Sequence, residues 1–309
     1  MDIDSWVIAT VARALAFSTP LLWAALGEIY AERAGVVNLG VEGMMILGAV
    51  VGFIAAQQSG SAWIGLLAAA GTGGLAALLH GVIAISIKAN QYVSGLALTI
   101  LGTGLSGLLG RGWEGVPLRH SMRNVSIPLL VDVPILGQAV FARQHVLTFA
   151  GLLVAVLLWF VLYRSRLGLT LRSVGESPQA ADTAGINVTA VRYGAVIFGG
   201  MMAGIAGGYL SLAYRPSWST GMTAGMGWIA LAIAIFAAWD PLRAIAASFL
   251  FGAFFHLSFR LQAMFVPELL RLLPYVFTIA ALSVSALGRG GRGFAAPESL
   301  GLPYQRGQR

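Results

Sequence analysis

The residues of this chain that could do chemistry are isolated polar side chains within long apolar segments. Asn38 and Glu42 lie in an apolar stretch with glycines at 35, 40 and 43, which permit a broken or re-entrant helix start. Asn90 and Gln91 open another apolar run. Polar side chains at membrane depth must face protein or a water-filled cavity, so these four residues are candidates to line a path. The alternative for the first pair is that Glu42 lies near the cytoplasmic interface while Asn38 caps the helix.

Catalytic and metal-binding arrangements are not recognisable in the sequence. It has no G-x-x-x-x-G-K-[ST] phosphate loop, no His/Glu cluster with metal-ligand spacing, and no persuasive set of Ser, His and Asp. Zero cysteines exclude disulfides, thiolate metal sites and cysteine catalysis. His80 stands alone among small residues, which favours a hydrogen-bonded structural role over a proton relay. We therefore predict no catalytic residue and no metal site, in a chain that moves something rather than transforming it.

The composition is that of a polytopic α-helical membrane protein. Of 309 residues, 58% are hydrophobic and only 10% are charged, and the mean hydropathy is +0.81. The formal net charge of +7 does not indicate a nucleic-acid partner, because the arginines are spread over loops. They are better explained as topology determinants that contact lipid headgroups. The 40 glycines suit close helix packing within a bilayer.

The apolar runs predict an all-α fold with about nine transmembrane helices. The first is expected to be retained, since the short acidic start lacks the cationic region of a signal peptide. Lysine and arginine counts favour a cytoplasmic C-terminus and, with nine crossings, an N-terminus outside. The four crossings before the fifth and the four after it would then run in opposite directions, which suggests inverted four-helix repeats joined by a linking span. The predicted crossings are 6–27, 28–57 (beginning with a polar turn at 28–33), 63–87, 92–109, 146–163, 194–214, 222–238, 244–259 and 269–287.

The polar segment 164–192 separates two apolar runs, and its arginines place it on the cytoplasmic side. Ser177 and Pro178 predict a helix start, with Ser177 as the N-cap and proline at the first helical position. Gly185 can supply the left-handed residue that ends the helix. The sequence therefore predicts a short cytoplasmic helix over 178–184. Its small alanines suit docking into a groove of another protein, and the alternative is a solvated loop with one stray helical turn.

Four stretches of the chain are distinctive when taken together and in order. They are GEIYAERAGVVNLGVEGMMILGA (27–49), NQYVSGLALTILGTGL (90–105), LRSVGESPQAADTAGINV (171–188) and GMTAGMGWIALAIAIFAAWDP (221–241). Together they resemble the permease subunits of ABC importers in the nucleoside group, which belongs to the larger family of sugar and branched-chain amino acid permeases. The resemblance covers most of the chain.

The resemblance implies the partners and the domain organisation of the chain. Family members pair two permease subunits, often non-identical, with cytoplasmic ATPase subunits, which use ATP and Mg. They receive solute from an extracytoplasmic binding protein. Residues 1–288 would form one permease domain in the inner (cytoplasmic) membrane, with coupling segment 164–192 and external loop 111–144. Residues 289–309 would form a flexible basic cytoplasmic tail. The chain itself is expected to sit in the lipid bilayer and to bind no cofactor.

The resemblance also assigns roles to residues. The stretch 176–188 matches the family's coupling helix, which sits in a groove of the ATPase and transmits its closure to the spans. The stretch 38–45 matches the broken-helix region beside the translocation path, which supports Asn38 and Glu42 as lining residues. The residues expected to couple to the ATPase are Glu176, Ser177, Pro178, Ala180, Ala181, Asp182 and Gly185.

The chain departs from the family pattern at three positions. Met226 stands where an Arg is expected, and Ala237 and Ala238 stand where a Gly and a basic residue usually precede Trp239. The missing charges suggest that a partner permease supplies them.

The expected solute is a nucleoside or a related purine or pyrimidine compound, with a simple sugar as the nearer alternative and another heterocycle as the more distant one. An ion- or proton-driven secondary transporter, with Glu42 as relay, is the alternative of another class.

Overall fold

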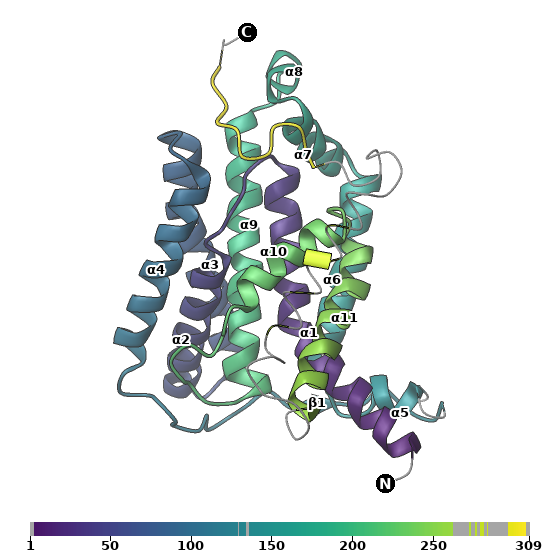
Figure 1. Cartoon of the computed structure of the whole chain (residues 1–309). Coiled ribbons are helices and arrows are strands. Elements are labelled where there is room, and N and C mark those ends of the chain that lie inside the picture. The colour runs from purple at the N-terminus through teal and green to yellow at the C-terminus, as the bar shows by residue number, and fades with distance from the viewer. Residues whose placement is uncertain are drawn as a thin grey trace.

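The computed structural model describes residues 3–128, 130–133, 136–261 and 296–306, together with the single positions 272, 276, 279, 280 and 283. Seven of the described helices are long and apolar enough to cross a membrane, which confirms a multi-pass helical membrane protein (Figure 1). These helices are α1 (Ile3–Arg33), α2 (Val41–Ser59), α3 (Ala62–Gly81) with the π-helical turn Val82–Ser86, α4 (Gln91–Gly110), α6 (Val146–Arg164), α9 (Val188–Tyr209) with the π-helical turn Leu210–Tyr214, and α11 (Pro241–Leu261).

Helix α9 lies in the middle of the bundle and packs against α1, α2 and α3 (Figure 1). Glycine makes the close approach possible, because the backbones of facing helices nearly touch. A Cβ atom added at Gly204 would lie 2.1 Å from the carbonyl oxygen of Ala69 on α3. One added at Gly207 would lie 1.8 Å from the carbonyl oxygen of Met45 on α2. The glycines of these helices therefore have the predicted role in close packing.

Helix α1 extends further than the sequence predicted. Residues 28–33, expected as a polar turn, form its last turns, and the non-helical link to α2 is confined to 34–40. The expectation failed because Glu28 and Glu32 are buried in the helix, where Glu28 accepts a hydrogen bond from the Asn38 amide in the following link and Glu32 accepts one from the Trp239 indole. Buried carboxylates are tolerated when such partners are available.

The crossing predicted at 222–238 is wrong. The helix there, α10 (Met226–Phe236), has 11 residues and is too short to span a bilayer. Backbone conformations with positive φ end it on both sides, at Gly221, Ala224 and Gly225 before it and at Ala238 and Trp239 after it. The crossing predicted at 269–287 lies outside the described residues.

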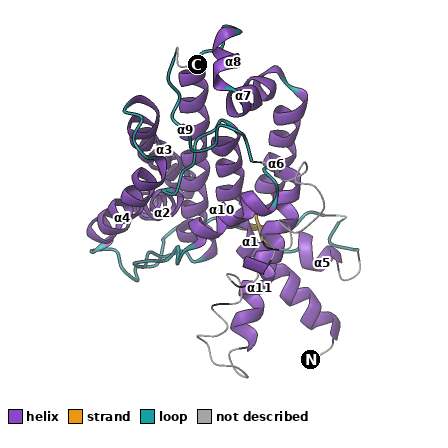
Figure 2. Cartoon of the chain, turned by 45° about the horizontal axis from the view of Figure 1, so that its top comes forward, coloured by secondary structure: helices purple, strands orange, loops and turns teal. Residues whose placement is uncertain are grey.

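The two ends of the bundle carry different structures. Helices α7 (Arg166–Glu176) and α8 (Pro178–Thr183) lie at one end, together with the segment 296–306 (Figures 1 and 2). The N-terminus, helix α5 (Leu136–Phe141) and the antiparallel pair β1 (Asn124–Val125) and β2 (Gln144–His145) lie at the other. The long polar loop expected at 111–144 therefore contains short ordered elements. Which end faces the cytoplasm stays a prediction.

Candidate functional site

Helix α8 forms as its sequence predicts, between a capping serine and a left-handed glycine. The Ser177 hydroxyl accepts a hydrogen bond from the Ala180 amide at 3.4 Å, and Pro178 takes the first helical position. Gly185 has φ +83°, and the Ile186 amide after it donates to the carbonyl oxygen of Ala181 at 3.0 Å. These are the start and stop signals of an independent short helix.

The predicted coupling residues divide between the two faces of α8. Pro178 and Ala181 are buried, and Ala181 packs in a small apolar cluster with Val174 of α7 and Val188 of α9. Ala180 is exposed, as are Gln179, Thr183 and Ala184. The inner face therefore anchors the helix, and the outer face exposes two alanines and two uncharged polar side chains.

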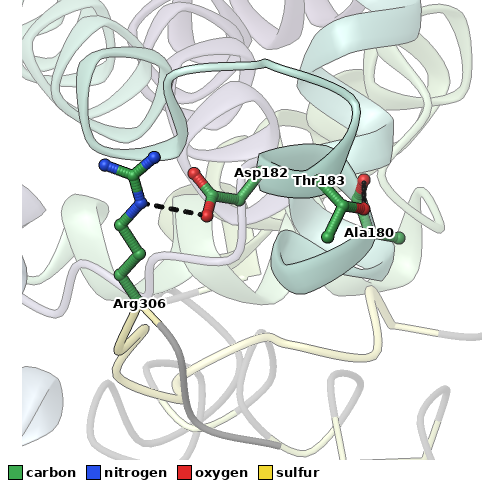
Figure 3. A network of polar contacts seen from close by, with 4 residues as sticks. All are labelled: Ala180, Asp182, Thr183 and Arg306. Carbon is green, nitrogen blue, oxygen red and sulfur yellow. Dashed lines mark hydrogen bonds and ion pairs between the residues drawn. The ribbon is translucent and has the colours of Figure 1, made fainter.

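The two acidic residues of the coupling set bind the C-terminal segment. The Asp182 carboxylate pairs with the Arg306 guanidinium at 3.3 Å, the one ion pair found in the part of the chain that the structure describes (Figure 3). The Glu176 carboxylate accepts a hydrogen bond from the Glu298 amide at 3.4 Å. Tyr304 packs on the apolar cluster below α8, where burial and the neighbouring Asp182 carboxylate raise the pKa of its phenol. The described part of the C-terminal segment, 296–306, thus contacts both α7 and α8.

Arg192 joins the same segment to the bundle. The sequence predicts Arg192 as one of the charges that set topology, but its side chain is only 2% exposed. Its guanidinium donates to the Ser299 hydroxyl and to the carbonyl oxygen of Leu302, both at 3.1 Å. The Ser299 hydroxyl donates to the carbonyl oxygen of Gly175 at 2.7 Å. The Gly301 amide donates to the carbonyl oxygen of Gly35, in the link between α1 and α2, at 3.2 Å.

Glu42 holds the start of α10. Its carboxylate accepts hydrogen bonds from the Thr223 hydroxyl at 2.5 Å, the Gly225 amide at 3.0 Å and the Gly227 amide at 2.7 Å. The first amides of a helix have no partner within the helix, and its N-terminus carries a partial positive charge, so a carboxylate there stabilises it. Glu42 therefore pairs with the free amides at the N-terminus of α10, the short helix found where a full crossing was predicted.

The other predicted path residues organise the link between α1 and α2. The Asn38 side chain is fully buried, and its carbonyl oxygen accepts from the Gly40 amide at 3.0 Å. The Gln91 side-chain oxygen accepts from the Val37 amide at 2.8 Å. Asn90 caps α4 by accepting from the amides of the two residues that follow Gln91. The side-chain oxygens of all three residues accept hydrogen bonds within the chain, whereas the Gln91 Nε2 is buried without a partner among the described residues, and a role in lining a path stays a prediction.

The sequence reading missed a second set of contacts, which holds the end of α10. The buried Glu32 carboxylate accepts a hydrogen bond from the Trp239 indole. The Arg33 guanidinium donates to the carbonyl oxygens of Ala238 and Trp239, both at 3.2 Å. The available signal was the pair of acids, Glu28 and Glu32, one helical turn apart in a span. The start of α10 is thus tied to α2 through Glu42, and its end is tied to α1 through Glu32 and Arg33.

Comparison with known proteins agrees with this architecture. The family model for the permease component of the branched-chain amino acid transport system matches residues 10–282. The chain is 40% identical to TsgC13 of Haloferax volcanii, an ABC transporter permease whose name assigns it provisionally to glucose, over 94% of this chain and 95% of that one. It is 36% identical to the guanosine ABC transporter permease NupQ of Bacillus subtilis over the full length of both.

A third relative points the same way. The nucleoside ABC transporter permease NupC of Lactococcus lactis subsp. cremoris is 36% identical over 98% of this chain and 99% of its own. No solved structure matches the chain. The chain therefore belongs to the family of permease components of branched-chain amino acid transport systems, and it is a transport subunit of the ABC class.

Proposed function

We propose that the chain is one membrane half of an ATP-driven importer for a nucleoside or a related purine or pyrimidine compound. The observation that carries this proposal is helix α8. It is capped at both ends, anchored on its inner face and furnished with small exposed residues, at the end of a bundle of membrane-spanning helices. Such a helix is suited to dock into a groove of a cytoplasmic ATPase, where ATP and Mg are used. The partners of the proposed assembly are that ATPase, a second permease and an extracytoplasmic solute-binding protein.

Motion of α8 has a direct route to the spans. Helix α7 follows α6 after a single residue, Ser165, and α8 follows α7 after Ser177. Through the apolar cluster of Val174, Ala181 and Val188, α8 also packs on the start of α9, the central helix. Closure of the ATPase pair would thus displace α8 and tilt α6 and α9 together, switching the permease pair between outward and inward access. In this proposal the end with α7 and α8 is cytoplasmic and the N-terminus lies outside.

The solute is proposed as a nucleoside because the two relatives at 36% identity that match nearly the whole chain are named for guanosine and for nucleosides. A simple sugar is the alternative, favoured by the 40% identity to the permease provisionally assigned to glucose. Met226, which stands where the family pattern has an arginine, lies at the start of α10, next to the Gly225 amide that donates to Glu42. In this proposal the second permease supplies the arginine that this chain lacks.

The docking proposal is tested by Ala180→Arg. This change adds a long cation to the exposed face of α8 and leaves the buried anchors intact. Asp182 is a poorer choice, because its substitution would also break the ion pair with Arg306. We expect an ATPase to co-purify with the tagged wild-type chain and with the control Gln58→Arg, an exposed position in the last turn of α2, but not with Ala180→Arg. Equal recovery with both variants would refute docking through α8.

The solute is tested with the purified complex in nanodiscs. ATP hydrolysis should rise when the solute-binding protein is added together with guanosine or uridine, and should stay at its basal rate with glucose. Stimulation by glucose alone would establish the sugar alternative. Uptake that persists without the ATPase and collapses with the proton gradient would instead support a secondary transporter. The three donors that engage Glu42 argue against its acting as a relay for protons.

A further inference from the structure

A cleft of about 310 Å³ lies beside α8, between parts of the chain that are far apart in sequence. Its wall on one side is α8 and the start of α9, and on the other the C-terminal segment with Tyr304 and Arg306. Lys88, from the turn between α3 and α4, completes the lining. The C-terminal segment therefore closes one side of the cleft through Tyr304 and Arg306.

The charge around the cleft is predominantly positive. Three basic residues line it, Lys88, Arg192 and Arg306, against one acidic residue, Asp182. The Arg192 guanidinium is buried and donates hydrogen bonds to Ser299 and Leu302. It therefore adds positive electrostatic potential to the cleft but is not counted as a donor for a ligand there. Arg306 pairs with Asp182 through its Nε only, and its side chain is 84% exposed. Donors of both Arg306 and Lys88 are thus available at the rim.

The position of Lys88 is held by the fold. Its φ of +60° is a left-handed conformation that a residue with a side chain rarely adopts, so surrounding structure must maintain it. The Ala89 amide that follows donates to the carbonyl oxygen of Ile83 at 3.0 Å, which fixes the turn. The Lys88 side chain is exposed at the cleft.

We infer that the ATPase-docking surface is composite, made of α8 and the segment 296–306, and that the cleft between them receives an acidic side chain of the ATPase. This inference rests on the proposed function, since it names a second contact for the same partner. A carboxylate suits the cleft because charge-assisted hydrogen bonds from guanidinium and ammonium groups are stronger than those between neutral groups. Helix α8 stands beyond the ends of the spans (Figure 1), which places the cleft toward a partner in water rather than toward lipid headgroups.

The test measures the affinity of the purified ATPase for the permease in nanodiscs. Lys88→Glu reverses the charge at the rim and keeps a side chain at the left-handed position. We expect it to weaken ATPase binding at least about tenfold, because it removes one charge-assisted contact and puts a repelling charge in its place. The matched control is Arg166→Glu, which makes the same charge change at the exposed start of α7 and should leave the affinity unchanged.

Arg306→Glu tests the C-terminal segment itself. It should weaken binding by at least the same factor, because it both reverses the rim charge and separates the segment from Asp182. Wild-type affinity in both Lys88→Glu and Arg306→Glu, while Ala180→Arg abolishes binding, would overturn the composite surface and leave the proposed function standing. Failure of the wild-type chain to bind an ATPase would overturn the proposed function as well. A loss seen only in nanodiscs containing anionic lipid would overturn the inference in favour of a headgroup site.

Discussion

Glu42→Gln is the substitution that most directly probes the start of α10. The change keeps the size of the side chain but replaces one carboxylate oxygen by an NH2 group. Glu42 Oε1 accepts from Thr223 and Gly225, and Oε2 accepts from Gly227. If the amide oxygen stays with the first pair, the Gly227 amide faces another donor and is left buried without a partner.

The cost follows from these contacts. An unsatisfied buried donor costs about 1–3 kcal/mol. The two remaining hydrogen bonds lose their charge assistance, and the helix N-terminus loses a favourable charge that contributes about 0.3–1 kcal/mol. We therefore expect Glu42→Gln to lower the free energy of unfolding by about 2–4 kcal/mol. Glu42→Ala, which leaves three donors unpaired, should cost more, roughly 3–6 kcal/mol.

The assay is unfolding of the purified chain in mixed micelles by titration with SDS, followed by far-ultraviolet circular dichroism. Glu114→Gln is the matched control, because Glu114 also accepts two hydrogen bonds, both from Thr220, but is exposed to solvent that can replace them. Glu114→Gln should therefore lower the free energy of unfolding by less than Glu42→Gln does. A Glu42→Gln protein within about 0.5 kcal/mol of the wild type would refute the reasoning. If that protein had also lost transport, Glu42 would act in the path rather than as a cap.

Two further substitutions test how the spans pack and how α10 ends. Gly207→Ala should prevent recovery of monodisperse folded protein in size-exclusion chromatography, because its Cβ would lie 1.8 Å from a carbonyl oxygen of α2. Gly194→Ala on the same helix meets nothing within 4 Å, so it should fold normally and gain up to about 1 kcal/mol from helix propensity; equal behaviour of the two would contradict the packing. Trp239→Phe removes the indole donor of Glu32 and should lower the free energy of unfolding by about 1–3 kcal/mol beyond the loss in Trp228→Phe; an equal loss in both would show that this hydrogen bond contributes nothing.

Several elements could be predicted because their signals are local. All seven described spans follow from runs of apolar residues, and α8 follows from the serine and proline before it and the glycine after it. Capping depends on neighbours within about four residues, and hydropathy is read over a window of about 19. Such features can be read without knowing how the chain packs.

The two wrong predictions, the end of α1 and the crossing at 222–238, concern backbone that depends on contacts outside the local sequence. The sequence predicts the end of α1 too early because Glu28 and Glu32 resemble surface residues, whereas the Asn38 amide of the following link and the distant Trp239 indole pair with them. The crossing at 222–238 was predicted because hydropathy counts apolar residues without showing where the backbone turns left-handed. In both places a distant partner, not the local sequence, made the observed backbone acceptable.

The sequence alone determined the class of protein, the approximate positions of most spans and the existence of the short helix at 178–183. Only the tertiary structure decided that Glu42 caps α10, that Glu32 and Arg33 hold its other end, and that residues 296–306 join Arg192 and Asp182 beside α8. The physical reason is the separation along the chain, since these partners lie more than one hundred residues apart. A buried polar group must be paired, but which group pairs with it depends on which helices come to lie side by side.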